Sequence, residues 1–149
     1  MTATTSNWAF QVMRALRPHQ WAKNTLVFLP LLLAQRWQEW DAWRSGALIF
    51  GVFCLAASGI YIVNDLLDIE ADRRHPTKKD RPFASGALSR RFGGILGAVL
   101  IVAALGVSGA TLPVGATLLV LIYGLLSTSY SVWLKRYVMV DVLVLSSLY

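Results

Sequence analysis

Apolar residues are gathered along this chain into long uncharged runs, separated by short basic segments. The stretch from Gly46 to Val63 carries no charged residue, and neither does the stretch from Phe92 to Leu134. A helix needs about 20 mostly apolar residues to cross a bilayer, so the second stretch is long enough for two crossings. The pattern predicts an all-α integral membrane protein built as a multi-helix bundle.

The same pattern predicts four complete helices and the start of a fifth. The expected ranges are 21–34, 45–72, 92–108, 113–133, and a last helix that begins near residue 138. The first range is short and contains Pro30, so it could form a tilted or re-entrant segment. A polar segment over 73–91 separates the second helix from the third. Because the fifth helix has no room to complete a crossing before Tyr149, we interpret residues 1–149 as a partial domain, truncated at its C-terminus.

Charge indicates the orientation of the chain in the membrane. The chain is 56% hydrophobic and 15% charged, with a net charge of +6. Of its 14 Lys and Arg residues, all but Arg36 and Arg44 fall on the same side as the N-terminus in this helix order. Basic residues are enriched in cytoplasmic loops. We therefore expect a cytoplasmic N-terminus and a cytoplasmic 73–91 loop in the cell inner membrane, and no nucleic-acid partner.

An acidic motif lies where the second apolar run ends. Successive helical residues are about 100° apart, so Asn64, Asp65, Asp68 and Asp72 form one stripe over two turns, while Glu70 points to the opposite side. Carboxylates at the edge of a membrane are costly and usually bind something. Oxygen ligands at this spacing suit Mg²⁺. The alternative is an ordinary solvated helix end, with the acids paired to the basic residues that follow.

Further polar residues fall at the same membrane face and are candidates for substrate binding: Lys23, Asn24, Lys78, Arg81, Tyr130 and Lys135. Each alone could be an interfacial anchor, since Lys side chains readily extend to the interface. A channel or transporter would instead distribute polar groups along a path across the bilayer. A structural membrane subunit would not need Asn64 and Asp65 so close to the hydrocarbon region of the bilayer. The gathering of polar groups at one face favours an enzyme with a shared cavity.

At these residues the sequence resembles the UbiA superfamily of intramembrane prenyltransferases. The matching elements are Asn64-xxx-Asp68-xxx-Asp72, Arg81-Pro82 with Ser85-Gly86, and Tyr130 with Lys135. Within the superfamily, the stretches 16–24, 75–78 and 130–135 are most similar to the decaprenyl-phosphate phosphoribosyltransferases. The resemblance covers nearly the whole chain but only about the first half of the nine-helix fold. It implies the first four to five helices of that fold, without the second Asp-rich motif, so we expect this segment alone to be inactive.

The resemblance also implies roles for the motif residues. Asn64, Asp68 and Asp72 would hold Mg²⁺ against a diphosphate, with Asp65, Asp68 and Asp72 as the catalytic acids. The substrate-binding residues would be Lys23, Asn24, Lys78, Arg81, Tyr130 and Lys135. In the phosphoribosyl branch the donor is 5-phosphoribosyl diphosphate and the acceptor a polyprenyl phosphate. In the prenyl branch a prenyl diphosphate reacts with an aromatic acceptor, and the acidic motif does not separate the two.

Overall fold

The computed structural model describes residues 7–132, and all regular structure within that range is helical. The elements in chain order are α1 (Trp8–Leu16), the 3₁₀ helix η1 (Pro18–Phe28), α2 (Leu29–Leu33), α3 (Trp40–Leu67), α4 (Ile69–Arg74), the 3₁₀ turn η2 (Lys78–Asp80), α5 (Arg90–Thr111) and α6 (Val114–Val132). The predicted all-α bundle is confirmed. The predicted fifth helix, beginning near residue 138, lies outside the described residues.

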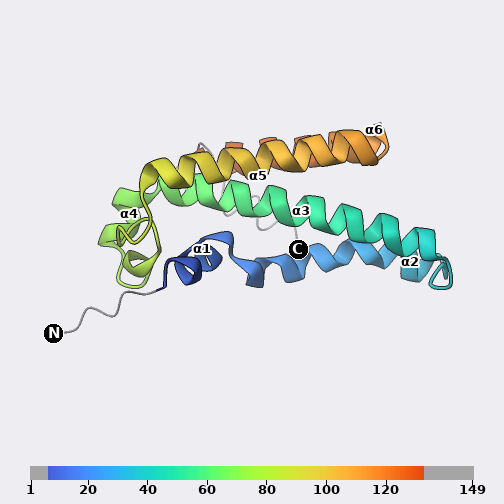
Figure 1. Cartoon of the computed structure of the whole chain (residues 1–149), viewed down its shortest axis with the longest axis horizontal. Helices are drawn as coiled ribbons and strands as arrows, with labels where there is room; N and C mark the ends of the chain where they lie inside the picture. The colour runs from blue at the N-terminus through green and yellow to red at the C-terminus, as the bar shows by residue number, and fades with distance from the viewer. Residues whose placement is uncertain (1–6, 133–149) are drawn as a thin grey trace, which may run out of the picture.

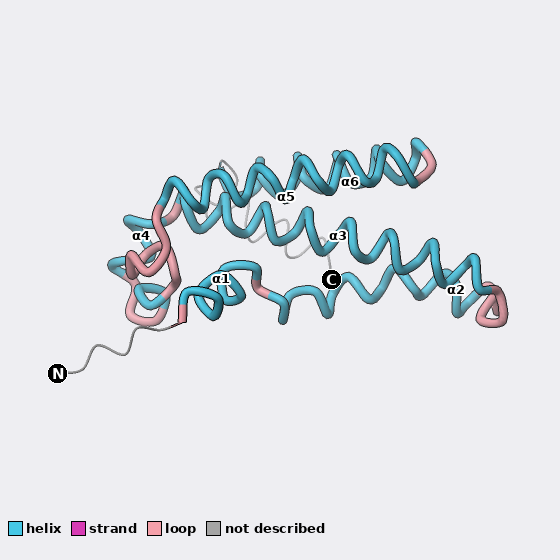
Figure 2. Tube along the Cα trace, in the orientation of Figure 1, coloured by secondary structure: helices cyan, strands magenta, loops and turns pink. Residues whose placement is uncertain are grey.

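Helix α3 runs through the middle of the bundle (Figure 1). It packs against α5 and α6 on one side and against α1, η1 and α2 on the other. Most loops lie towards the two ends of the long axis (Figure 2): α4 and its loop at one end, the turns α2–α3 and α5–α6 at the other, while the short α1–η1 junction lies between them. The end of α3 that carries the acidic motif therefore lies beside α1 and the start of α5.

Two described helices, α3 and α5, are long and apolar enough to cross a bilayer, and α6 contains a shorter apolar helix. The second predicted range, 45–72, is not one continuous helix. Asp68 has φ −98° and ψ 5°, which ends α3 and starts α4, although its N–H still donates to the Asn64 carbonyl at 3.0 Å. Short polar residues tolerate this sparsely populated backbone region. The acidic motif thus spans a slight break rather than a regular helix end.

The N-terminal third differs from the expectation of one helix over 21–34. The chain forms η1 and then α2, and Pro30 lies in the first turn of α2, where its missing N–H costs nothing. Helix α1 was not predicted. It begins where the Asn7 side chain accepts a hydrogen bond from the Ala9 N–H at 3.1 Å. It leaves Phe10 and Met13 exposed while one face packs on α3.

A buried serine ties this N-terminal segment to α3. The Ser58 hydroxyl donates to the Leu16 carbonyl at 2.8 Å and accepts from the Trp21 indole N–H at 3.0 Å. Ser58 is 1% exposed, so both partners would be difficult to replace by water. Leu16 ends α1 and Trp21 lies in η1. These two bonds therefore fix the turn between them against the middle of α3.

Two apolar clusters hold the helices together. The first joins α1, α3, α4, the following loop and α5, and its buried members are Ala15, Ile62, Ile69, Phe83 and Leu88. The second joins α3, α5 and α6 through Val52, Ala56, Ala104 and Val120. The first cluster lies directly under the acidic motif and the loop that follows it. Its packing therefore sets where the charged side chains of that end can meet.

Candidate functional site

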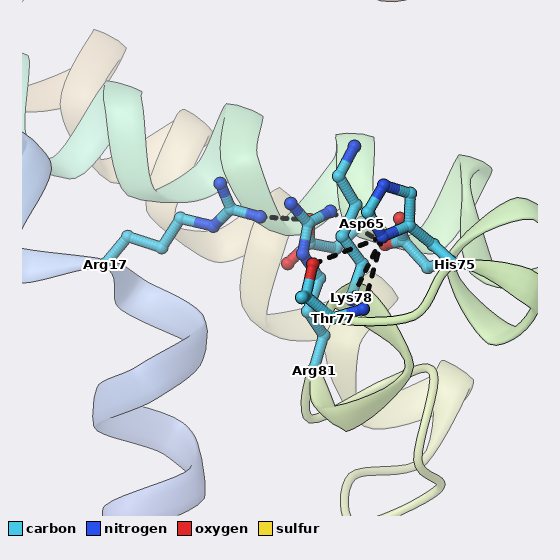
Figure 3. A network of polar contacts seen from close by, with 7 residues as sticks. Arg17, Asp65, His75, Thr77, Lys78 and Arg81 are labelled. Carbon is cyan, nitrogen blue, oxygen red and sulfur yellow. Dashed lines mark hydrogen bonds and ion pairs between the residues drawn. The ribbon is translucent and has the colours of Figure 1, made fainter.

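Two arginines meet a buried carboxylate at the C-terminal end of α3 (Figure 3). The side chain of Asp65 is 5% exposed. Its Oδ1 accepts from Arg17 Nη2 at 2.5 Å and from Arg81 Nη1 at 3.2 Å. Arg81 Nη1 also donates to Asp72 Oδ2 at 2.7 Å, and the Asp72 side chain is likewise 5% exposed. The four side chains form one charge-balanced network from three separate segments of the chain.

Helix geometry brings the two acids together. Asp65 and Asp72 are seven residues apart, which is close to two full turns, so they share a face despite the break at Asp68. The loop after α4 then returns to this face and presents Arg81. It is held there because Phe83, two residues later, is 2% exposed in the first apolar cluster. Local helix periodicity and loop packing thus both position the network.

Arg17 reaches Asp65 because the backbone reverses at that residue. Arg17 has φ 53° and ψ 57°, the left-handed conformation, between α1 and η1. Its guanidinium carbon also lies 5.1 Å from the centre of the Tyr61 ring, one turn before Asp65 on α3. A left-handed conformation costs a non-glycine residue about 1–2 kcal/mol. The ion pair and the ring contact offset that cost.

Three members of the network line a cavity of about 490 Å³. Besides Arg17, Asp65 and Arg81, its wall contains Arg14 and His19. Three guanidinium groups and one carboxylate line the wall, and when Asp72 is counted as a partner of Arg81 one positive charge remains in excess. Guanidinium groups bind phosphate oxygens in a fork geometry with strong, charge-assisted hydrogen bonds. The cavity is therefore chemically suited to an anion that carries phosphate groups.

The neighbouring stripe has the donor chemistry of a hard cation site. Asn64 Oδ1 is buried and has no hydrogen-bond partner. Asp68, one turn later, is half-buried. Within residues 7–132 no three His, Cys, Asp or Glu side chains converge as a metal-binding group. Mg²⁺ commonly takes only one or two carboxylates and completes its shell with substrate phosphates and water. The oxygen atoms of Asn64, Asp68 and Asp72 thus suit a hard cation by their chemistry, and the metal site stays a prediction.

Other candidate residues lie elsewhere. Asn24 Nδ2 is 3.4 Å from Cys54 Sγ, three turns before Asp65 on α3, so the structure does not bring Asn24 into the network. Lys23 is exposed on η1. Lys78 is exposed. Its backbone N–H donates to His75 Nδ1 at 3.4 Å, and the same nitrogen accepts from the Thr77 N–H (Figure 3).

Glu70 points away from the network, as the helical geometry predicts. It is exposed and pairs with Arg90 at 2.6 Å and with Arg73 at 3.4 Å. The side chain of Tyr130 and the whole of Lys135 lie outside what the structure describes. From the sequence, Arg17 was interpreted only as one of the basic residues that indicate membrane orientation, and its contact with Asp65 was missed. The available signal was its position at the membrane face of the acidic motif.

Sequence comparison decides the family of this chain. The model of the UbiA prenyltransferase family matches residues 25–149. The chain belongs to the UbiA prenyltransferase family. The resemblance seen in the acidic motif and the Arg-Pro element is thereby confirmed. Together with the apolar helices α3 and α5, membership shows that this UbiA-family chain is an integral membrane protein.

Three curated relatives illustrate where the chain lies within the UbiA family. It is 35% identical to decaprenyl-phosphate phosphoribosyltransferase of Mycobacterium tuberculosis (strain CDC 1551 / Oshkosh), over 100% of this chain and 50% of the relative. It is 38% identical to the protein of the same name from Mycolicibacterium smegmatis, over 91% of this chain and 44% of the relative. It is also 38% identical to nodulation protein NoeC of Azorhizobium caulinodans, over 91% of this chain and 43% of the relative. The chain spans about half the length of these relatives.

Proposed function

We propose that the full-length protein containing this chain is a Mg²⁺-dependent intramembrane transferase that acts on a diphosphate donor. The favoured reaction moves 5-phosphoribosyl from phosphoribosyl diphosphate to a polyprenyl phosphate. The observation that carries the proposal is the Arg17–Asp65–Arg81–Asp72 network, three members of which, Arg17, Asp65 and Arg81, line a cavity at the end of an apolar helix. The named relatives support the choice of donor and acceptor.

The residues of this chain would act mainly on the diphosphate leaving group. As the anomeric C1–O bond breaks, its electron pair passes to the diphosphate, and an oxygen of the acceptor phosphate forms the new bond to C1. Arg81 and Arg17 would donate hydrogen bonds to the diphosphate oxygens as negative charge builds up there. Lys78 would add a mobile positive charge from the loop. Mg²⁺, when bound by Asn64, Asp68 and Asp72, supplies further charge neutralisation of the diphosphate.

The orientation is proposed as well. The loop after α4 and helix α1 lie at one end of α3 (Figure 1). The network joins these segments there. That end holds most of the basic residues, which favours the cytoplasmic side of the inner membrane. A water-soluble phosphoribosyl donor would enter from the cytoplasm, while the lipid phosphate would reach the same end from the bilayer.

A second candidate keeps the site but changes the donor. The matching family is described as prenyltransferases, which favours transfer of a prenyl group from prenyl diphosphate to an aromatic acceptor. The same guanidinium groups would stabilise the same diphosphate leaving group. The two candidates differ in what is bonded to the diphosphate and in the acceptor.

A donor panel tests the proposal. The full-length protein in detergent is given Mg²⁺ and either labelled 5-phosphoribosyl diphosphate with polyprenyl phosphate, or labelled prenyl diphosphate with an aromatic acceptor. Labelled lipid in the first mixture alone supports the phosphoribosyl reaction. Label transfer in the second alone selects the prenyl candidate, and transfer in neither rejects a diphosphate-dependent transferase.

Two variants tie the activity to this site. Asp68→Ala should reduce turnover to background, because it removes a carboxylate from the proposed metal site. Asp41→Asn is the matched control: Asp41 is an exposed carboxylate on the first turn of α3, at the opposite end of the same helix. Retained turnover in Asp68→Ala would remove that residue from the metal site, and chelation of Mg²⁺ should abolish turnover of the unaltered protein reversibly.

A further inference from the structure

The oxygen-bearing side chains of the acidic motif do not have equivalent surroundings. Asp65 is buried and its Oδ1 already accepts from two guanidinium groups. Asn64 Oδ1, the neighbouring amide oxygen, is buried with no hydrogen-bond partner. A buried charge is tolerated only when it is paired, whereas a buried acceptor without a partner is where a ligand would be gained. The two atoms therefore point to different tasks within one motif.

We propose that Asp65 is a positioning residue that holds Arg17 and Arg81 on one carboxylate oxygen at the cavity wall, and is not a ligand of the metal ion. The inference rests on the proposed function for its substrate, a phosphate-bearing anion. It separates Asp65 from the metal set of Asn64, Asp68 and Asp72. It also explains how Arg17 is held at the cavity wall.

Arg17 is oriented from two sides. Its Nη2 donates to Asp65, and the face of its guanidinium lies over the Tyr61 ring at 5.1 Å. Arg81 is also fixed twice, by Asp65 and by Asp72. Each guanidinium has five N–H donors, so both keep donors free of these contacts for an anion. Fixing the groups in advance lowers the entropy lost when they bind a phosphate.

The local charge supports this division of tasks. Arg17 and Arg81 carry two positive charges, and Asp65 carries one negative charge. The carboxylate of Asp72 supplies the second negative charge, and it contacts Arg81 but not Arg17. A metal ion taking an oxygen from Asp72 would leave Arg81 with Asp65 and the substrate. A metal ion on Asp72 would sit beside one guanidinium group, that of Arg81, whereas a metal ion on Asp65 would sit beside two, which is electrostatically less favourable.

Titrations of the full-length protein test the division. Turnover is measured against Mg²⁺ and against the diphosphate donor for Asp65→Asn, Arg17→Gln and Asp68→Asn. Asp65→Asn and Arg17→Gln should raise the donor KM about tenfold or more, while the half-saturating Mg²⁺ concentration stays within about twofold. Asp68→Asn should raise the half-saturating Mg²⁺ concentration. A shift in Mg²⁺ dependence for Asp65→Asn as large as for Asp68→Asn would overturn the proposal.

A matched control and a double variant complete the test. Arg90→Gln removes one partner of an exposed ion pair at the same end of the molecule and should leave both titrations unchanged. The combined Arg17→Gln/Asp65→Asn variant should raise the donor KM clearly less than the product of the two single effects, because Asp65 acts partly through Arg17. Multiplicative effects would contradict the positioning role.

A readout without substrate separates this inference from the proposed function. Melting midpoints of the two single variants and the double variant are compared in detergent, with neither Mg²⁺ nor donor present. The melting midpoint of the double variant should fall by about 2–4 °C less than the sum of the two single losses, as expected for two residues in direct contact. Strict additivity would refute the Arg17–Asp65 contact. If the unaltered protein transfers no group from any donor, the proposed function fails, and this comparison still decides the contact.

Discussion

Gly59 and Gly97 face each other where α3 packs against α5. A Cβ atom built on Gly59 would lie 3.0 Å from the Gly97 carbonyl oxygen and 2.7 Å from a side-chain carbon of Ile101. A Cβ atom on Gly97 would lie 3.5 Å from the Gly59 carbonyl oxygen. Small residues at such a crossing let two helix backbones approach closely within a membrane. The crossing lies one to two turns from Asp65, so it helps to set the site end of the bundle.

Gly59→Ala should therefore destabilise the protein by about 1–3 kcal/mol, because the backbone on the other side has no room to yield. Thermal unfolding in detergent measures the loss. Gly51→Ala is the matched control on the same helix, since a Cβ atom there meets nothing within 4 Å. It should be neutral or slightly stabilising, by up to about 1 kcal/mol. Equal losses in the two variants would show that close approach at Gly59 is not the cause.

Ser58→Ala should cost about 1–3 kcal/mol of stability, because it leaves the Leu16 carbonyl and the Trp21 indole N–H without their partner in a buried position. Unfolding in detergent gives the loss, and the fluorescence of Trp21, measured in a variant that keeps only this Trp, should shift as its indole loses the bond. Thr25→Ala is the control: its hydroxyl is exposed and bonds only the nearby Ala22 carbonyl. That change should stay within about 0.5 kcal/mol.

The parts of the fold that follow from local pattern were predictable. Uncharged runs locate α3, α5 and α6, and a rotation of 100° per residue places Asp65 and Asp72 on one face with Glu70 away from them. These features depend on residues close in the sequence. The same rule could not show the break at Asp68, because it assumes a regular helix.

The missed features depend on contacts between distant residues. Arg17 and Asp65 are 48 positions apart, and no local pattern encodes the left-handed backbone that brings them together. Asn24 was expected near the acidic motif because the predicted helix 21–34 begins at the membrane face that carries the motif, but Asn24 lies seven residues beyond Arg17. In a 3₁₀ helix the chain rises about 2 Å per residue, so η1 carries Asn24 roughly 14 Å further along α3, to Cys54.

The backbone at Arg17 gives a prediction that separates conformation from charge. Both Arg17→Ala and Arg17→Gly remove the ion pair with Asp65. Only glycine adopts the left-handed conformation without steric cost. Arg17→Gly should therefore be more stable than Arg17→Ala by about 1 kcal/mol in thermal unfolding, while both lose the same affinity for the diphosphate donor. An Ala variant as stable as the Gly variant would mean that the turn relaxes to another conformation.

The orientation can be tested by labelling single cysteines in spheroplasts. Cys54 and any cysteine outside residues 1–149 are first replaced by Ala, so that each variant carries one thiol. Lys79→Cys places it in the exposed loop after α4, and Gln38→Cys places it in the exposed turn before α3. If the N-terminus and the charged network are cytoplasmic, a membrane-impermeant maleimide should label Gln38→Cys in intact spheroplasts and Lys79→Cys only after permeabilisation. The reverse pattern would place Arg81 and the cavity on the outer face, where no cytoplasmic diphosphate could reach them.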